Sequence, residues 1–401
     1  MKKILSISLI FSLILSMQIF DVQPAAAQPY VSAQAAVLIE QQSGRILFGH
    51  KHRERLGMAS TTKIMTAIVA LEHGNLDDIV TVSAAAANVE GSSMWLEAGE
   101  NIPLEDLIWG LMLASGNDAA TAIAEHISGE IESFAELMNE TAARIGVLDT
   151  NFTNPHGLSD ENHYTTALDL AIITAYGLQI PKFAEIVATR RKIVSWEDRD
   201  YGRTLNNHNR MLNMYQGSTG VKTGFTRATG RCLVSSAVRD FDGVEMQLIA
   251  VTLNAPNDWA DHKAMLDYGF YNFAPRVLAS PDEEFSTIAV TYGESEILPL
   301  KAGGQYIFPL RESERQTVRI AANMPDSIEA PIQTGDLVGH ITVTIGDEEF
   351  SNYPIFAAMS IERKKTIFGG DVPPVEKSFG ERFRENLVTL LEEWVRALAL
   401  I

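Results

Sequence analysis

The chain has few cysteines and few basic residues for its length. Its 401 residues include one cysteine, Cys232, so no intramolecular disulfide can form and the fold must rest on its apolar core. Cys232 opens the apolar stretch Cys232-Leu233-Val234, which favours a buried packing role over a reactive one.

The shortage of basic residues excludes one class of partner. The chain carries 32 Lys and Arg against 51 Asp and Glu, for a formal net charge of −19. Nucleic acid phosphates repel such a chain, so we expect no nucleic acid partner. Hydrophobic residues at 46% and charged residues at 21% are typical of a globular protein, and the length suits two domains.

The apolar run at the N-terminus is too short to span a membrane comfortably. Residues 4–15 are apolar except for serines, follow Lys2 and Lys3, and precede the small residues Ala25-Ala26-Ala27. This order predicts a secretory signal peptide over residues 1–27, in preference to an uncleaved anchor. No cysteine lies near the cleavage site, which excludes a lipid-modified N-terminus.

The periodicity of the following 250 residues predicts an α/β (α+β) domain over residues 28–275. Strands are expected at Val37–Ile39 and Ile46–Phe48, around a Gln-Ser-Gly turn, and again at Arg231–Val238 and Met246–Leu253. Helical spacing is found at Ser60–Glu72, Leu104–Leu113, Asp118–Ile127, Glu132–Ile145, Thr166–Tyr176 and Asp258–Phe270. Strands at both ends with helices between them indicate a layered fold whose sheet is assembled from both ends.

The pattern changes near Ala274 to short strand-like runs separated by turns. The runs are Thr287–Tyr292, Gln305–Phe308, Thr317–Ile320 and Val338–Ile345. They predict a small all-β domain over residues 276–366. Residues 367–401 are then expected to form a linker, which contains Pro373-Pro374, and a terminal helix.

The tail has the spacing of an amphipathic helix. Its apolar residues recur along one face and charged residues fill most of the rest; the face includes Phe383, Leu387, Leu390, Leu391, Trp394 and Leu398. Glu and Arg interrupt the segment too often for it to span a bilayer, and a tryptophan suits the membrane interface. We therefore expect residues 380–401 to lie on the outer face of the cytoplasmic membrane. The alternative is a helix that docks on the all-β domain or pairs with another copy.

The first motif with chemical meaning is Ser60-Thr61-Thr62-Lys63. Residues three apart share a helix face, so Ser60 and Lys63 can approach each other. A serine hydroxyl is a weak nucleophile, and a lysine with a depressed pKa can act as its base. The pattern by itself is weak, because an N-cap serine and a solvated lysine would give the same letters.

Two further motifs supply polar groups for a substrate. Ser115-Gly116-Asn117 follows an apolar helix and offers a hydroxyl to relay a proton and an amide to orient a peptide bond. Lys222-Thr223-Gly224 offers a positive charge and a hydroxyl that suit a substrate carboxylate, and a glycine against which a substrate backbone can lie. By itself, Ser115-Gly116-Asn117 could equally be a helix terminus with a cap for the next helix. By itself, Lys222-Thr223-Gly224 could equally be an edge strand with an exposed lysine.

Taken together, the three motifs are far more specific, because each occurs once and in the order Ser-x-x-Lys, Ser-x-Asn, Lys-Thr-Gly. The chain resembles the low-molecular-mass penicillin-binding proteins, specifically the serine-type D-alanyl-D-alanine carboxypeptidases. The likeness covers the whole mature chain. Supporting segments are Ala36–Ile39 with Ser43-Gly44, Ala59–Met65, Ser115–Ala119, Asn154–Leu158 and Lys222–Thr226.

The resemblance implies a penicillin-binding transpeptidase-like fold and a set of residue roles. Ser60 would attack the carbonyl between two D-alanines, and Lys63 would accept its proton. Ser115 would relay a proton to the departing D-alanine. Asn117, Lys222, Thr223 and Gly224 would bind the substrate, and no metal or organic cofactor is needed. The implied partners are peptidoglycan stem peptides and β-lactam antibiotics, with roles in cell wall biogenesis and cell shape.

Other functions remain open on the sequence alone. A serine β-lactamase shares the motifs, but no glutamate between Ser115 and Lys222 has an asparagine four residues on, as the class A deacylating glutamate has. The same site could cleave crosslinks as a DD-endopeptidase. A non-catalytic wall-binding protein is disfavoured by the intact motifs. His156, in Asn154-Pro155-His156-Gly157, favours a turn over an extra acid or base.

Overall fold

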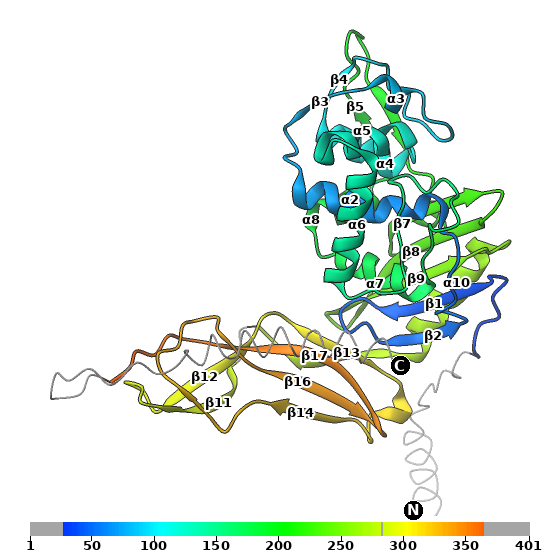
Figure 1. Ribbon diagram of the computed structural model, residues 1–401. Helices are drawn as coiled ribbons and strands as arrows, with labels where there is room; N and C mark the ends of the chain where they lie inside the picture. Colours follow the sequence, from blue (N-terminus) through cyan, green and yellow to red (C-terminus); the bar gives the residue numbers. More distant parts are fainter. Residues whose placement is uncertain (1–26, 282–283, 365–401) are drawn as a thin grey trace, which may run out of the picture.

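The computed structural model describes residues 27–281 and 284–364 of the chain. They form a larger body of helices and sheet and an elongated body built from strands (Figure 1). Apart from Ala27, the predicted signal peptide lies outside the described residues, and so does the predicted tail helix. Among the described helices no single one is long and apolar enough to cross a membrane. One bent pair, Ala167–Gly177 with Pro181–Ala188, is long and apolar enough when the two helices are taken together.

The larger body is organised around a five-stranded antiparallel sheet. Its order is β2 (Ile46–His50), β1 (Ala35–Glu40), β9 (Val244–Leu253), β8 (Gly230–Phe241) and β7 (Ser218–Thr226). Strand β1 pairs with β9 from Ala35 opposite Leu253 to Glu40 opposite Leu248. The sheet is therefore assembled from both ends of this body, which confirms the predicted layered fold.

Helices cover both faces of this sheet (Figure 1). On one face α7 (Ala167–Gly177) and α8 (Pro181–Ala188) pack on the sheet. They share a core with α2 (Lys63–His73), α4 (Leu104–Leu113), α5 (Asn117–Ser128) and α6 (Ile131–Ile145), whereas α10 (Asp258–Asn272) packs on the other face. Alternate residues of β1 enter the two cores, with Val37 and Ile39 in one and Ala36 and Leu38 in the other. Burial on both faces explains why this strand reads as a continuous apolar run.

The start of the first helix differs from the sequence prediction. Residues Ala59–Thr62 form a short 3₁₀ turn, η1, and the α-helix begins at Lys63. The Thr61 and Thr62 hydroxyls donate to the carbonyls of Met58 and Ala59, three residues back, which favours the tighter turn. Ser60 therefore lies on η1 and Lys63 on α2. The remaining predicted helices of this body agree with the structure to within two residues at each end.

Several short elements were not predicted from the sequence. They are β3 (Ile79–Thr81), α3 (Ala84–Ala87), β4 (Asn101–Pro103), β5 (Arg191–Val194), β6 (Arg203–Asn206) and α9 (Met211–Met214). The predicted packing role of Cys232 is confirmed, since its side chain is buried and burial raises the thiol pKa to about 11.

The second body is all-β, as predicted. A six-stranded sheet has the order β14 (Arg319–Asn323), β16 (Leu337–Ile345), β17 (Glu348–Ala357), β12 (Ile297–Ala302), β11 (Glu284–Thr291) and β15 (Ser327–Glu329). A smaller pair joins β10 (Ala274–Ala279) to β13 (Tyr306–Leu310), and a 3₁₀ turn, η2, spans Glu312–Glu314. Strands β10, β12, β15 and β17 were missed by the sequence analysis. The domain boundaries drawn above remain predictions.

One buried arginine links the two bodies. Arg45, in the turn between β1 and β2, places Nη2 2.6 Å from Oε1 of Glu314 and Nη1 3.0 Å from Oε2, and also donates to the Pro309 carbonyl. Its guanidinium lies 5.2–5.4 Å from the ring centroids of three aromatics, Phe273, Phe308 and Phe350. A bidentate pair among apolar rings holds a defined geometry between the bodies.

We expect Arg45→Ala to lower the free energy of unfolding by about 3 kcal/mol, because it removes a buried guanidinium packed among three rings and leaves the half-buried Glu314 carboxylate without that partner. The matched control is Arg55→Ala, which removes an exposed pair with Asp149 and should cost less than about 1 kcal/mol. Equilibrium denaturation of both variants measures the difference. Equal losses would contradict a special role for the Arg45 pair.

Candidate active site

The three sequence motifs meet beside the edge strand β7. A Cβ placed on Gly224 would lie 3.0 Å from the Met58 carbonyl oxygen and 3.1 Å from the Ser60 backbone nitrogen. The glycine therefore allows η1 to approach the strand closely. Strand β7 pairs only with β8 in the five-stranded sheet, so Thr223 and Gly224 lie on its open edge.

Lys63 is the centre of the site. Its Nζ lies 3.0 Å from Ser60 Oγ, and it donates to Asn117 Oδ1 and to the His156 carbonyl oxygen, each at 2.7 Å. The side chain is fully buried. Burial, and then the positive charge of Lys222, hold the pKa of Lys63 well below its usual range, although Asp118 opposes the shift.

Ser115 and Lys222 form a second contact in the cleft. Lys222 Nζ donates to Ser115 Oγ at 2.9 Å and to the Thr223 carbonyl at 3.1 Å. Ser115 joins α4 to α5 with a φ of 61°, a strained conformation for a residue other than glycine. Lys222 is 1% exposed, and burial lowers its pKa to about 7.

Asn117 connects Lys63 to the rest of the fold. Its Oδ1 accepts from Lys63, while its Nδ2 donates to the Glu90 carbonyl at 2.6 Å. The neighbouring Asp118 carboxylate accepts from the backbone N–H groups of Met94 and Leu96, each at 3.1 Å. Through Asp118, helix α5 thus holds the loop before β4 close to the catalytic residues. The structure brings all the sequence-predicted site residues to one cleft.

His163 is a supporting residue that the sequence analysis missed. Its Nδ1 accepts from the Thr153 backbone N–H at 3.1 Å, and its Nε2 lies 2.7 Å from Thr62 Oγ1, which donates to the Ala59 carbonyl. Burial lowers the pKa of His163 to about 4, so the ring is neutral and Nε2 carries the proton. This chain of hydrogen bonds fixes the position of η1, the turn that carries Ser60. No local motif marks this histidine.

His156 contributes its backbone to the cleft. Its carbonyl accepts from Lys63, while its ring Nδ1 accepts from the Leu158 N–H at 3.2 Å. Burial, together with Lys63 and then His163, lowers the pKa of the imidazole to about 3. A Cβ on the next residue, Gly157, would lie 2.0 Å from the Ala59 carbonyl oxygen. The turn interpretation of this segment therefore accounts for its geometry.

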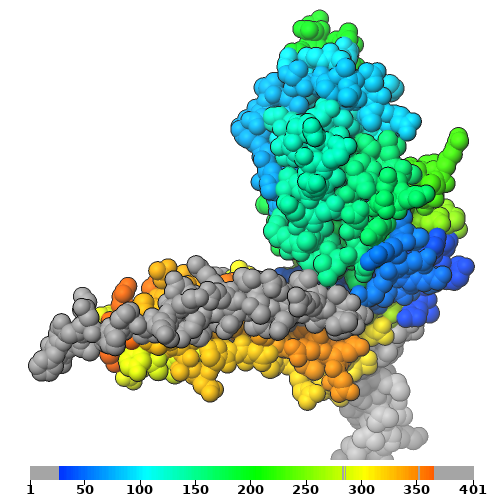
Figure 2. Space-filling view, viewed as in Figure 1, coloured from blue at the N-terminus to red at the C-terminus, as the bar shows by residue number. Residues whose placement is uncertain are grey.

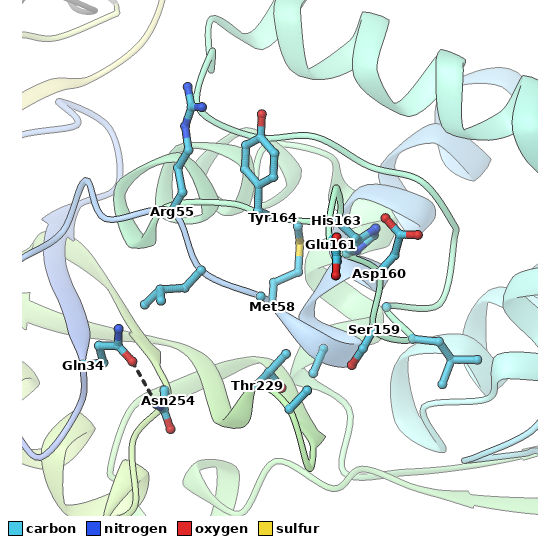
Figure 3. Close-up of a pocket in the computed structure, with 16 residues that line it drawn as sticks. Gln34, Arg55, Met58, Ser159, Asp160, Glu161, His163, Tyr164, Thr229 and Asn254 are labelled. Atoms are coloured by element: carbon cyan, nitrogen blue, oxygen red, sulfur yellow. Dashed lines mark hydrogen bonds between the residues drawn. The ribbon is translucent and has the colours of Figure 1, made fainter.

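A cavity of about 560 Å³ opens beside η1. Met58 and Ala59 are among its lining residues, and Ser159, Asp160 and Glu161 lie close together in its wall (Figure 3). Within residues 27–281 and 284–364, no group of three or more His, Cys, Asp or Glu side chains is arranged to hold a metal ion.

Comparison with known families agrees with this geometry. Residues 22–257 match the family model for D-alanyl-D-alanine carboxypeptidase, and residues 273–363 match the model for the C-terminal domain of penicillin-binding protein 5. The D-alanyl-D-alanine carboxypeptidase DacF of Bacillus subtilis is 33% identical over 82% of this chain and 86% of its own length. DacA of Haemophilus influenzae is 30% identical, over 83% and 86% respectively.

Solved structures give the same result. Penicillin-binding protein 5 from Haemophilus influenzae has a TM-score of 0.70 and 29% identity, and the match covers 84% of this chain and all of that one. A Streptomyces K15 DD-transpeptidase has a TM-score of 0.57 and 30% identity, over 61% of this chain and 99% of that one. With its motifs gathered in one cleft and both family models matched, the chain belongs to the serine-type D-alanyl-D-alanine carboxypeptidases, the low-molecular-mass penicillin-binding proteins.

Proposed function

We propose that this carboxypeptidase works through an acyl-Ser60 intermediate in which Lys63 is the base. The observation that carries the proposal is the set of three contacts at Lys63 Nζ. Two of its partners, Asn117 Oδ1 and the His156 carbonyl, are acceptors only. A neutral amine has two N–H groups for these partners and one lone pair left, which faces Ser60 Oγ and can accept its proton.

The reaction then proceeds with each proton accounted for. Ser60 Oγ bonds to the carbonyl carbon between the two D-alanines while its proton passes to Lys63. The carbon–nitrogen bond breaks, and the proton held by Lys63 passes through Ser115 to the departing amine, which leaves Lys63 neutral again. Water next cleaves the ester, which frees the shortened peptide and restores the Ser60 hydroxyl.

The remaining site residues bind and orient the substrate. Lys222 and Thr223 bind its terminal carboxylate, and Asn117 holds a peptide bond of the stem. The Ser60 backbone N–H and a second N–H on the strand after Gly224 stabilise the developing oxyanion. The close packing of η1 on β7, where a Cβ on Gly224 would lie 3.1 Å from the Ser60 backbone nitrogen, supports this assignment.

Members of the family act on peptidoglycan peptides and bind β-lactams. Mass spectrometry of products from a muropeptide pentapeptide, a crosslinked dimer and penicillin, offered separately, tests the proposed reaction. We expect loss of one alanine from the pentapeptide and a stable penicilloyl adduct on the protein. Faster cleavage of the dimer than of the pentapeptide would instead make the chain a DD-endopeptidase.

We further propose that the enzyme is exported and that its tail, residues 380–401, binds the outer face of the cytoplasmic membrane. The apolar stripe through Leu387, Leu391 and Trp394 supports this placement. The polar face mixes acidic and basic residues, so apolar burial should contribute more than attraction to anionic lipid.

Deleting residues 377–401 is expected to release a soluble enzyme that still forms the penicillin adduct. Binding of the full-length mature protein to membranes should resist high salt and yield to detergent, because apolar burial dominates it. Fractionation of both forms after each wash measures this. Leu391→Glu should weaken binding, whereas Glu392→Gln on the polar face is the matched control. If the full-length protein is as soluble as the truncated one, the tail is not an anchor.

A further inference from the structure

Three aromatic residues are linked through Arg203 at the tip of the larger body. Trp95 is 73% exposed and Tyr201 is 63% exposed, while Trp196 is half-buried. We call these three residues the aromatic rim. In Figure 2 the light-blue and green atoms that gather at the tip carry the colours of residues near 95 and near 200. Large exposed rings grouped in this way mark a binding surface more often than an ordinary soluble face.

Trp95 is held rigidly although its ring is exposed. The backbone N–H groups of Met94 and Leu96 on either side donate to the Asp118 carboxylate, and that of Trp95 donates to Ser93 Oγ at 2.7 Å. Trp95 has a φ of 67°, which is unfavourable for a bulky side chain. An exposed ring adds little to the stability of the fold, so it does not offset the strain of this backbone conformation. We therefore infer that the ring is held in place to contact a ligand.

A buried ion pair holds the rim together. Arg203 donates to Glu100 through Nη1 and Nη2, each at 3.0 Å, with both side chains less than 5% exposed. Arg203 also donates to the Trp95 carbonyl at 2.9 Å and lies 4.3 Å from the Trp196 ring centroid. Trp196 in turn contacts Tyr201 edge-to-face at 5.9 Å. A costly buried pair is thus used to position all three rings.

The rim is directly connected to the cleft. The Asn117 N–H donates to the Ser92 carbonyl at 2.7 Å, and its side chain donates to Glu90, so the loop that carries Trp95 is fixed to a residue that contacts Lys63. A ligand on the rim would therefore belong to the same large substrate as the peptide in the cleft.

We propose that the aromatic rim binds sugar rings of the glycan strands that carry the stem peptides, an inference that rests on the proposed action on peptidoglycan. The apolar C–H faces of a pyranose ring stack on exposed aromatic faces. Charge disfavours an anionic ligand, because the exposed residues next to the rings in sequence carry more negative than positive charge: Glu97, Glu197, Asp198 and Asp200 against Arg199, which pairs with Glu97. These carboxylates would repel an anionic lipid surface more strongly than a glycan strand, in which every second sugar, N-acetylglucosamine, carries no charge.

Titration calorimetry with peptide-free glycan strands tests the proposal on the Ser60→Ala protein, which cannot turn over substrate. Removing two stacking rings, Trp95→Ala with Tyr201→Ala, should weaken binding at least about tenfold. Trp95→Gly should lose binding while thermal unfolding shows an intact fold, because glycine accepts the positive φ. The matched control is Tyr271→Ala, an aromatic on α10 that is also 60% exposed and should change nothing.

Three results would overturn the inference. They are no binding of glycan strands by the Ser60→Ala protein, equal binding by the rim variants, or rim-dependent binding to phosphatidylglycerol vesicles in place of glycan. Penicillin labelling and release of D-alanine from a soluble pentapeptide test the proposed function separately in the protein with Ser60 intact. Success there without glycan binding would reject only the rim, whereas rim-dependent glycan binding without labelling would reject only the catalytic assignment.

Discussion

Replacing Ser60 with alanine is expected to abolish covalent labelling by penicillin and to lower release of D-alanine by ~10⁴-fold or more. The Ser60 hydroxyl is the group that Lys63 Nζ approaches at 3.0 Å, so no ester can form once it is removed. Labelling with a fluorescent penicillin on denaturing gels measures adduct formation, and analysis of released D-alanine measures turnover. Ser60→Ala should unfold at the same temperature as the parent protein, because the change removes one hydroxyl and its hydrogen bond with Lys63.

The adduct on the unmodified protein should be long-lived. Between Ser115 and Lys222 the chain has no glutamate with the spacing of a class A deacylating residue, so hydrolysis of the penicilloyl ester should be slow. Ser295→Ala, in the all-β body, is the matched serine control and should label normally. Rapid release of penicilloate without a trapped adduct would instead make the protein a β-lactamase.

Replacing Lys63 with arginine should be nearly as damaging, with a loss of ~10³-fold or more in the rate of acylation. An arginine keeps a positive charge in the cleft but cannot give up its proton at working pH, so it cannot accept the proton of Ser60. Stopped-flow or quenched measurements of penicillin acylation give the rate directly. Lys222→Arg is the matched control and should retain more activity, because binding a carboxylate requires only the charge.

The pH dependence of kcat/KM should show the titration of both lysines, Lys63 and Lys222. Below the pKa of Lys63 its amine is an ammonium without a lone pair, so activity rises as pH increases through that value. Above the pKa of Lys222, about 7 in the free enzyme, the charge that binds the carboxylate is lost and activity falls. Burial lowers the pKa of both lysines, and repulsion by the charge of Lys222 lowers that of Lys63 further.

In Lys222→Arg the falling limb should disappear between pH 7 and the pH where the fold fails, since arginine stays charged. Near-normal acylation by Lys63→Arg would show that another group takes the proton. An unchanged falling limb in Lys222→Arg would show that a different group titrates there.

Elements with strong local patterns could be predicted from the sequence. The helix at Leu104–Leu113 and the hairpin between β8 and β9, with Asp242-Gly243 in its turn, follow from periodicity and turn chemistry. Short elements such as β3 and β5 were not predicted, because three or four residues contain too little periodicity to distinguish a strand from a loop. The switch from α-helix to 3₁₀ turn at Ser60 depended on side-chain hydroxyls that bond locally.

The chemistry of the site divides in a similar way. The sequence by itself determined which residue types carry it, because Ser-x-x-Lys, Ser-x-Asn and Lys-Thr-Gly are local patterns whose joint occurrence is specific. Only the tertiary structure decided the state of Lys63, since its acceptors are Asn117, 54 residues away, and the His156 carbonyl, 93 residues away. The structure alone also gave a role to His163 and connected Trp95 to Trp196 through Arg203. Burial, depressed pKa values and shared contacts arise from residues distant in sequence, and no spacing along the chain encodes their approach.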